Sequence, residues 1–221
     1  MDAVRKKPLW IVGGSQGIGK YLRESLDADY ELHSFSRREG FDFAEEGVVR
    51  ELLVDRGTPF AWIHCPGSFL EVPLLETSAQ DWEELLRSNL WSFLNAAKTI
   101  LPAMGDEGGG RVLTFGAAAL GQRRAKLRGP AYFAVKEALL SVVQSLAKEW
   151  APRGVLLNLI SPGLIAHEHS ARESQERMRS KVPLGRLGNP SDLLGLVRLL
   201  LSPQGSYLVG QELVVDGGLS L

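Results

Sequence analysis

Residues 9–19 read Leu-Trp-Ile-Val-Gly-Gly-Ser-Gln-Gly-Ile-Gly, and this stretch decides the fold. The apolar run Leu9–Val12 is typical of a buried parallel strand, and the sequence from Ile18 onward has the pattern of an amphipathic helix. The glycines therefore lie in a turn between a strand and a helix. Glycine lets a backbone approach a phosphate closely, and a helix N-terminus offers unpaired N–H groups and a positive dipole end. The turn is a candidate pyrophosphate site, although an ordinary glycine-rich turn would share its Gly-x-x-x-Gly-x-Gly spacing.

Strand-like and helix-like stretches alternate along the rest of the chain. The strand candidates are Leu9–Val12, Glu31–Phe35, Ala61–His64, Arg111–Phe115, Leu156–Ile160 and Glu212–Val215. The helix candidates between them are Ile18–Leu26, Ala79–Leu101, Ala131–Trp150 and Ser191–Leu201. No repeat, low-complexity block or linker divides the chain. The pattern predicts a single α/β domain over residues 1–221, built on a Rossmann-like doubly wound parallel sheet.

The connection after the second strand is unusually short. Between Ser36 and Asp42 there is room for only a tight loop, whereas a full crossover helix needs about a dozen residues or more. We therefore expect a third strand that is either very short, around Phe41–Phe43, or reached without a helix.

The end of the second strand bears on the choice of dinucleotide. A ribose-binding acid is expected about 20 residues past the glycines, or an arginine where a 2′-phosphate is bound. Here the strand ends in Ser36, Arg37 and Arg38, with no acid at the tip. Because arginine binds phosphate in a bidentate fashion, the pattern favours NADP(H) over NAD(H). The alternative is a pair of solvated surface arginines.

Tyr132 and Lys136 form a candidate proton-transfer pair. They stand four residues apart in a predicted helix and so face the same side. A nearby ammonium stabilises a phenolate, so we expect Lys136 to lower the pKa of Tyr132 toward a useful range. Such a tyrosine can protonate a carbonyl oxygen as hydride arrives from a nicotinamide. The spacing alone is common on plain helix surfaces, and its place downstream of a dinucleotide turn gives it weight.

These features together resemble the classical short-chain dehydrogenases/reductases, and among them the β-ketoacyl carrier-protein reductases. The resemblance runs essentially from end to end. It rests on Val12–Gly19, Ser88–Leu90, Gly110–Thr114, Tyr132–Lys136, Asn158–Gly163, Pro183–Gly188 and Val215–Gly218.

The resemblance implies roles for individual residues. Asn89 would hold a water that relays protons through Lys136, and Lys136 would also bind the nicotinamide ribose. Tyr132 would be the acid, so the implied catalytic residues are Asn89, Tyr132 and Lys136. The implied cofactor contacts are Gly13, Ser15, Gln16, Gly17, Ile18, Gly19, Ser36, Arg37, Arg38, Asp42, Phe43, Cys65, Pro66, Gly67, Tyr132, Lys136, Pro162, Gly163 and Ile165.

Two departures from the family pattern stand out. The family's Asn-Asn-Ala-Gly is His64-Cys65-Pro66-Gly67 here, which loses the asparagine hydrogen bonds. His64 and Cys65 are too few to form a zinc site, so we expect Cys65 to be a small buried residue lining the cofactor cleft. Ala117 stands where the substrate-orienting serine belongs. Losing a donor to an oxyanion can cost about 10²–10³ in rate.

The missing serine leaves three functional readings open. The first is an NADPH-dependent reductase of a carbonyl or imine-like group. The second is a quinonoid dihydropteridine-type reductase, since those distant relatives also have alanine there and a compressed second crossover. The third is a non-catalytic NADP-binding regulatory protein that has kept the fold. Retention of Tyr132, Lys136 and Asn89 favours catalysis, because a structural role requires none of them.

Composition narrows the setting and the partners. The formal net charge is −1, which gives no global bias toward nucleic acid or an anionic membrane. The single cysteine, Cys65, excludes an intrachain disulfide and suits a reducing compartment, so we expect a cytoplasmic protein. No apolar run reaches the length of a membrane helix, about 20 residues. The resemblance implies a homodimer or homotetramer built on the helices that contain Asn89 and Tyr132 and on the C-terminal segment.

Basic residues surround the implied substrate side. Four of them precede Tyr132: Arg123, Arg124, Lys126 and Arg128. More lie in the polar stretch that occupies the family's lid position, about residues 164–185 and including His167 and His169. They fit recognition of a carrier-linked or acidic substrate, or simply a solvated loop and helix face. The substrate itself is expected to be a small carbonyl compound.

Overall fold

The fold is a parallel sheet in a computed structural model that describes residues 6–118, 120–121, 125–166 and 172–221. Within these residues the sheet has six strands in the order β2-β1-β3-β4-β5-β6. They are β1 (Pro8–Val12), β2 (Glu31–Phe35), β3 (Ala61–His64), β4 (Gly110–Phe115), β5 (Val155–Pro162) and β6 (Glu212–Val215). Each predicted strand is present to within two residues at either end. The predicted single-domain, doubly wound architecture is confirmed.

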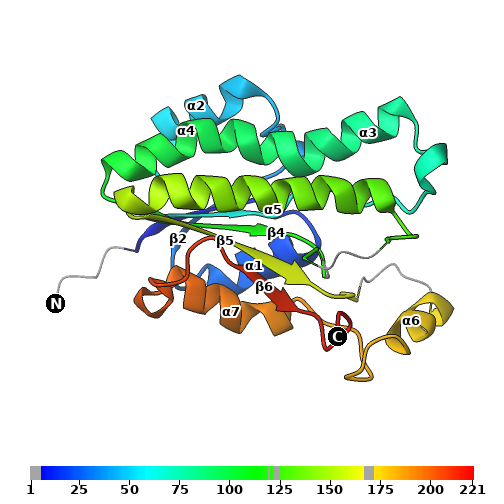
Figure 1. The fold of residues 1–221 in the computed structure, drawn as a ribbon. Helices are drawn as coiled ribbons and strands as arrows, with labels where there is room; N and C mark the ends of the chain where they lie inside the picture. The colour runs from blue at the N-terminus through cyan, green and yellow to red at the C-terminus, as the bar shows by residue number, and fades with distance from the viewer. Residues whose placement is uncertain (1–5, 119, 122–124, 167–171) are drawn as a thin grey trace.

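Helices cover both faces of the sheet (Figure 1). On one face lie α1 (Gly17–Leu26) and α7 (Ser191–Leu201). On the other lie α2 (Glu46–Arg56), α3 (Ala79–Leu86), α4 (Ser92–Asp106) and α5 (Pro130–Trp150). The short α6 (Arg172–Arg179) stands apart from both layers. None of the described helices is both long and apolar enough to cross a bilayer.

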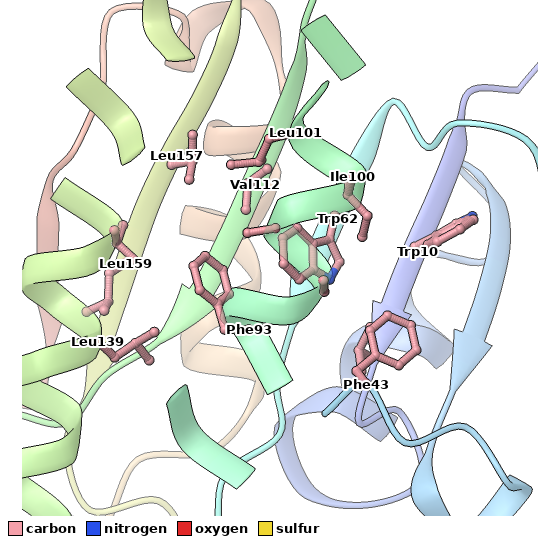
Figure 2. Close-up of a cluster of buried hydrophobic side chains, with 14 of the residues drawn as sticks. Trp10, Phe43, Trp62, Phe93, Ile100, Leu101, Val112, Leu139, Leu157 and Leu159 are labelled. Atoms are coloured by element: carbon pink, nitrogen blue, oxygen red, sulfur yellow. The ribbon is translucent and has the colours of Figure 1, made fainter. Parts of the chain in front are cut away.

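Side chains on the two faces of β1 pack into two separate hydrophobic cores. Trp10 and Val12 belong to the cluster under α2, α4 and α5, where Trp62 stacks on Phe93 with ring centroids 5.0 Å apart (Figure 2). Leu9 and Ile11 belong to the cluster under α1 and α7. Successive side chains of a strand point to opposite faces, so a strand buried on both sides must be apolar throughout. This is why the strand-like runs are continuous rather than alternating.

The additional short strand expected around Phe41–Phe43, directly after the second strand, is absent. After β2 the chain makes a 3₁₀ turn over Arg37–Glu39 and passes directly into α2 and then β3. Phe41 packs edge-on against Phe35 with ring centroids 5.3 Å apart, and Phe43 is buried. Both forms of the expectation, a very short strand at Phe41–Phe43 or a strand reached without a helix, are therefore wrong. The rings of Phe41 and Phe43 pack into the same core cluster as the buried side chains of α2, and β2 forms the edge of the sheet.

The predicted helix over Ala79–Leu101 is interrupted by a π-helical turn, Arg87–Trp91. In a π turn each N–H bonds to the carbonyl five residues back, so nearby carbonyls lose their α-helical partners. Side chains replace them at three places. Ser88 Oγ donates to Glu84 O at 2.7 Å, Asn89 Nδ2 to Leu85 O at 3.0 Å, and Ser92 Oγ to Ser88 O at 2.8 Å. Such bonds to the residue four back bend helices.

His64 braces this turn from the sheet. Its Nε2 lies 3.0 Å from Ser92 Oγ. Because that hydroxyl donates to Ser88 O, Nε2 must carry the hydrogen that bonds to Ser92, and Nδ1 is the bare nitrogen. Burial, with a smaller effect of Lys136, lowers the pKa of His64 to about 3, so the ring is neutral at ordinary pH. The sequence indicated only that the family's asparagine bonds were lost, whereas the imidazole makes a different bond in their place.

The first prediction tests this brace. Ser92→Ala removes the hydroxyl and leaves the buried His64 N–H and the Ser88 carbonyl without partners. The free energy of unfolding, measured by urea denaturation, should fall by about 1–3 kcal/mol. Ser145→Ala is the matched control, because Ser145 Oγ makes the same bond to Ser141 O at 2.9 Å on an exposed helix surface. Its effect should stay within about 0.5 kcal/mol. Equal losses for the two variants would contradict the brace.

Candidate active site

The loops after β1, β2 and β3 meet at one edge of the sheet. Gly13 N–H donates to Phe35 O at 2.8 Å, and Cys65 N–H donates to Val12 O at 2.9 Å. These bonds continue the ladder past the ends of the strands. The connections from β1 and β3 leave in opposite directions in the sheet order, which makes this edge a topological switch point. Ligands of open α/β sheets bind at such points.

The glycine turn is shaped for close backbone approach. Gly13 has φ 81°, and a Cβ there would lie 3.0 Å from Pro66 N. A Cβ on Gly19 would lie 2.3 Å from Gly13 O, so both positions exclude larger residues. Gly17, the first residue of α1, faces open space, and Gln16 before it makes no side-chain cap. An open, uncapped helix N-terminus fits a phosphate group.

Other predicted cofactor residues line the same turn and the loop facing it. Ser15 and Ile18 are half-buried, and Ile18 packs against the core beneath α1. Cys65, expected to be a small buried residue, is half-buried, and burial raises the pKa of its thiol to about 12 against the opposing effect of Lys136. The group is therefore a neutral thiol with the character of a small apolar residue. The described residues contain no cluster that could hold a metal ion.

The two arginines after β2 are separated in the structure. Arg38 Nη2 donates to Gln16 Oε1 at 3.1 Å, which places Arg38 beside the glycine turn. Arg37 Nη2 instead donates to Glu84 Oε1 on α3, also at 3.1 Å. Glu39, an acid that the sequence pattern did not single out, accepts a hydrogen bond from the Ser36 hydroxyl. The only signal for it was its position three residues after Ser36.

Asp42 is held in place by the π turn. Its Oδ1 accepts a bond from Ala44 N–H at 2.9 Å, and its Oδ2 accepts one from Arg87 Nη2 at 2.9 Å. Arg87 also bonds Glu45. Partial burial acts to raise the pKa of Asp42, but these hydrogen bonds outweigh it and hold the pKa below its usual range. The Asp42 carboxylate, one of the implied cofactor contacts, is thus ionised and fixed.

Asn89 and Lys136 meet at Gly67. A Cβ on Gly67 would lie 2.5 Å from Asn89 Oδ1 and 3.2 Å from Lys136 Nζ. Asn89 is fully buried, and its Oδ1 has no partner among the described residues. Its amide nitrogen is engaged by Leu85 O and Ser68 O. A buried oxygen without a partner is costly, so this atom is placed to accept a bond from a water or a cation.

Tyr132 and Lys136 share a face of α5, but they do not interact as expected. Lys136 Nζ donates to Phe115 O at the end of β4, at 2.7 Å, and lies 5.8 Å from the centre of the Tyr132 ring. Burial lowers the pKa of Lys136 to about 8. Burial raises the pKa of Tyr132 to about 12. The predicted lowering by Lys136 is wrong for this arrangement, because the ammonium is directed at the Phe115 carbonyl.

Two aromatic rings pack against Tyr132. Phe69 and Phe133 meet the Tyr132 ring edge-on, with centroids 5.0 and 5.5 Å away, and Phe69 is 59 % exposed. Of the basic residues before Tyr132, Arg128 pairs with Glu71 at 3.2 Å and Lys126 lies over the Phe133 ring. Arg123, Arg124, His167 and His169 lie outside the described residues.

The loop after β5 is packed against the C-terminal segment. Gly163 N–H donates to Val215 O at 2.9 Å, and a Cβ on Gly163 would lie 2.7 Å from Asp216 Cα. Ile165 forms a β-bridge with Gly188. A cavity of about 200 Å³ lies here, and its lining includes Gly163 and Ile165 but not Asn89, Tyr132 or Lys136. Ala117 is buried in the larger core cluster beside Leu120.

Comparisons with known proteins agree with this arrangement. Residues 48–220 match the family model described as enoyl-(acyl carrier protein) reductase. Carbonyl reductase family member 4 of Xenopus laevis is 28% identical over 96% of this chain and 97% of its own. The 3-oxoacyl-[acyl-carrier-protein] reductase FabG of Vibrio cholerae is 31% identical over 79% of this chain and 72% of its own.

Solved structures give the same result. A short-chain dehydrogenase from Leptospira borgpetersenii with bound NAD+ superimposes with a TM-score of 0.87, at 26% identity, over 100% of this chain and 95% of its own. A putative NAD(P)-dependent gluconate 5-dehydrogenase from Beutenbergia cavernae with bound NADP also gives 0.87, at 26% identity, over 98% of each chain. With a family model that covers most of its length, this chain belongs to the classical short-chain dehydrogenase/reductase family of oxidoreductases.

Proposed function

We propose that this protein is an NADPH-dependent oxidoreductase that reduces a carbonyl or imine-like group. The observation that carries the proposal is that Asn89 Oδ1 and Lys136 Nζ both approach Gly67, while Lys136 shares a face of α5 with Tyr132. This convergence lies at the sheet edge that holds the uncapped glycine turn. A structural role alone would not require a buried amide oxygen without a partner.

The chemistry divides between the cofactor and the chain. NADPH, when bound, supplies a hydride to the substrate carbon. Tyr132 gives its hydroxyl proton to the substrate oxygen or nitrogen, and its raised pKa keeps it protonated until then. Lys136, with a pKa of about 8, is mostly protonated at neutral pH and so retains the charge needed to stabilise a phenolate. To do so, its ammonium must turn from Phe115 O toward the hydroxyl.

Asn89 is proposed to anchor the relay that returns a proton to the pair. Its Oδ1 can accept a bond from a water or from Lys136, while the amide nitrogen is fixed by two carbonyls. The π turn that presents it is held by His64 and Ser92 from the sheet side. π-helical turns are frequent at functional sites.

The choice of NADPH over NADH rests on Arg38. Its guanidinium lies beside the glycine turn and bonds only a neutral amide there, so it is available to a 2′-phosphate. Structural relatives carry NAD+ in one case and NADP in another, which supports a nicotinamide cofactor in general. The contacts proposed for Pro66, Pro162 and the other predicted cofactor residues follow from the same placement.

The substrate is proposed to be a small carbonyl compound approached from the Phe69 side of Tyr132. The names of the relatives point to carbonyl groups, and one to a carrier-linked 3-oxoacyl group. The pairing of Arg128 with Glu71 leaves less support for an acidic carrier than the sequence suggested. A quinonoid dihydropteridine-type substrate is the second candidate, because the compressed crossover has no third strand and Ala117 brings no hydroxyl.

A homodimer or homotetramer and a cytoplasmic location belong to the same proposal. Trp91, in the π turn that contains Asn89, is 41 % exposed, and Tyr207 and Leu221 near the C-terminus are fully exposed. Large exposed apolar side chains on these elements are consistent with an interface there. The reducing compartment inferred from the single cysteine, Cys65, stays a prediction.

The second prediction concerns the proton donor. Tyr132→Phe should lower turnover of an NADPH-coupled ketone by about 10²–10⁴-fold, because general acid catalysis contributes that much. Its dissociation constant for NADPH should change little. Lys136→Ala should damage both turnover and NADPH binding, since one ammonium serves both. Steady-state absorbance at the nicotinamide band and calorimetric titration measure the two quantities. A Tyr132→Phe variant with most of the parent rate would place the acid elsewhere.

The third prediction separates the two arginines. Arg38→Ala should weaken NADPH binding by about 1.5–3 kcal/mol and leave NADH nearly unchanged, because a charge-assisted contact to the 2′-phosphate is lost. Arg37→Ala is the matched control, because Arg37 bonds Glu84 and should affect NADPH much less. Calorimetric titration with both dinucleotides gives the answer. If the two substitutions weaken NADPH binding equally, the assignment of Arg38 rather than Arg37 as the ligand of the 2′-phosphate is contradicted.

The fourth prediction uses the alanine at the serine position. Ala117→Ser should raise turnover of simple ketones by up to about 10²-fold, because a donor would then face the developing oxyanion. With quinonoid dihydropterin the gain should be small, since that ring is already polarised. Ala118→Ser on the adjacent half-buried residue is the control. If both proteins stay inactive on every substrate while binding NADPH, the non-catalytic reading becomes the better one.

A further inference from the structure

The turn after β2 carries a carboxylate, that of Glu39, directly after the arginine proposed to bind a 2′-phosphate. Ser36 Oγ donates a 2.6 Å bond to Glu39 Oε2. Ser36 is 5 % exposed and follows Phe35, whose carbonyl accepts the bond from Gly13 N–H. The carboxylate is therefore held next to the strand end that borders the glycine turn.

The backbone of the turn fixes this placement. Glu39 N–H and Phe41 N–H both donate to Ser36 O at 3.0 Å. Gly40 takes the left-handed conformation, with φ 88°, and so closes the 3₁₀ turn over Arg37–Glu39. The side chain of Glu39 is folded back over Ser36 by this geometry.

The charges in the turn largely cancel. Arg37 is paired with Glu84, and Arg38 is bonded to the neutral Gln16. Glu39 adds a negative charge beside Arg38. Two arginines thus stand with two carboxylates, where the sequence suggested an uncompensated double-arginine site. A carboxylate near a phosphate repels it, and Ser36 cannot donate to a phosphate while its hydrogen is given to Glu39.

We propose that Glu39 is a cofactor-selectivity residue that reduces the preference for NADPH, so that the protein also accepts NADH. The proposal rests on the nicotinamide-dependent reduction proposed above. Glu39 acts on the phosphate by charge and by withdrawing the Ser36 hydroxyl. It acts on NADH in the opposite sense, since a carboxylate accepts a bond from a free ribose 2′-hydroxyl.

The test measures dissociation constants of NADPH and NADH for the full chain by calorimetry, at low and high salt. Glu39→Gln keeps the size of the side chain and an oxygen that can accept the Ser36 hydroxyl, but removes the charge. The selectivity ratio, the NADH constant divided by the NADPH constant, should rise about tenfold, which corresponds to about 1.4 kcal/mol. Glu39→Ala, which also frees the Ser36 hydroxyl, should raise it at least as much.

Two controls separate charge at the site from other effects. Glu51→Gln makes the same change of net charge on the exposed surface of α2 and should leave the ratio unchanged. Raising the ionic strength from about 0.05 M to 0.5 M should shrink the Glu39→Gln effect, because salt screens exposed charges.

An unchanged ratio in both Glu39 variants, or an equal shift for the two dinucleotides, would overturn the role of Glu39 while leaving the reductase proposal intact. Wild-type protein that binds neither dinucleotide would overturn both. A rise in the ratio that Glu51→Gln reproduces would also count against Glu39, since the effect would then come from net charge alone.

Discussion

The structure depends on a parallel sheet that is apolar on both faces and whose strands all end at the same edge. β1 shows the constraint most clearly, with Trp10 and Val12 buried under one helical layer and Leu9 and Ile11 under the other. Because each parallel strand must return through a crossover, all the following loops are delivered to the same edge. The bonds from Gly13 N–H and Cys65 N–H then lock the loops after β1 and β3 to their neighbours. The candidate site is assembled from these loops and from the helices that follow them.

Buried polar groups then define what the site can do. The π turn would leave carbonyls without partners in an apolar layer, and the side chains of Ser88, Asn89 and Ser92 donate to them. His64 on β3 in turn bonds the Ser92 hydroxyl. Within the site, Asn89 Oδ1 and the neighbouring His64 Nδ1 have no partner among the described residues, and Lys136 Nζ donates to the Phe115 carbonyl. Unsatisfied or weakly satisfied buried groups are costly, which is part of the reason for proposing that Asn89 and Lys136 take part in the chemistry.

In the segment between β2 and α2, ion pairs rather than a strand hold the backbone in place. The short connection after β2 has no third strand to anchor it, and Arg37–Glu84 and Arg87–Asp42 tie it to α3 and the π turn. These pairs are partly exposed, so each contributes modestly to stability, about 1 kcal/mol or less. Their larger effect is positional. They hold Arg37 against α3, away from the glycine turn, and fix the carboxylate of Asp42.

The sequence by itself determined the architecture, because strands buried on both faces and amphipathic helices are local patterns with distinct periods. It placed all six strands, the strand–turn–helix at the glycines, and Tyr132 and Lys136 on one helix face. Only the tertiary structure decided which partners the polar side chains take. Arg37 turns to Glu84, Lys136 to Phe115 O, and His64 to Ser92, across separations that no local pattern encodes. The tertiary structure likewise decided that no extra strand forms around Phe41–Phe43 and that the pKa of Tyr132 is raised. Each is set by which groups are desolvated and what faces them in three dimensions, and that information exists only once distant segments have packed.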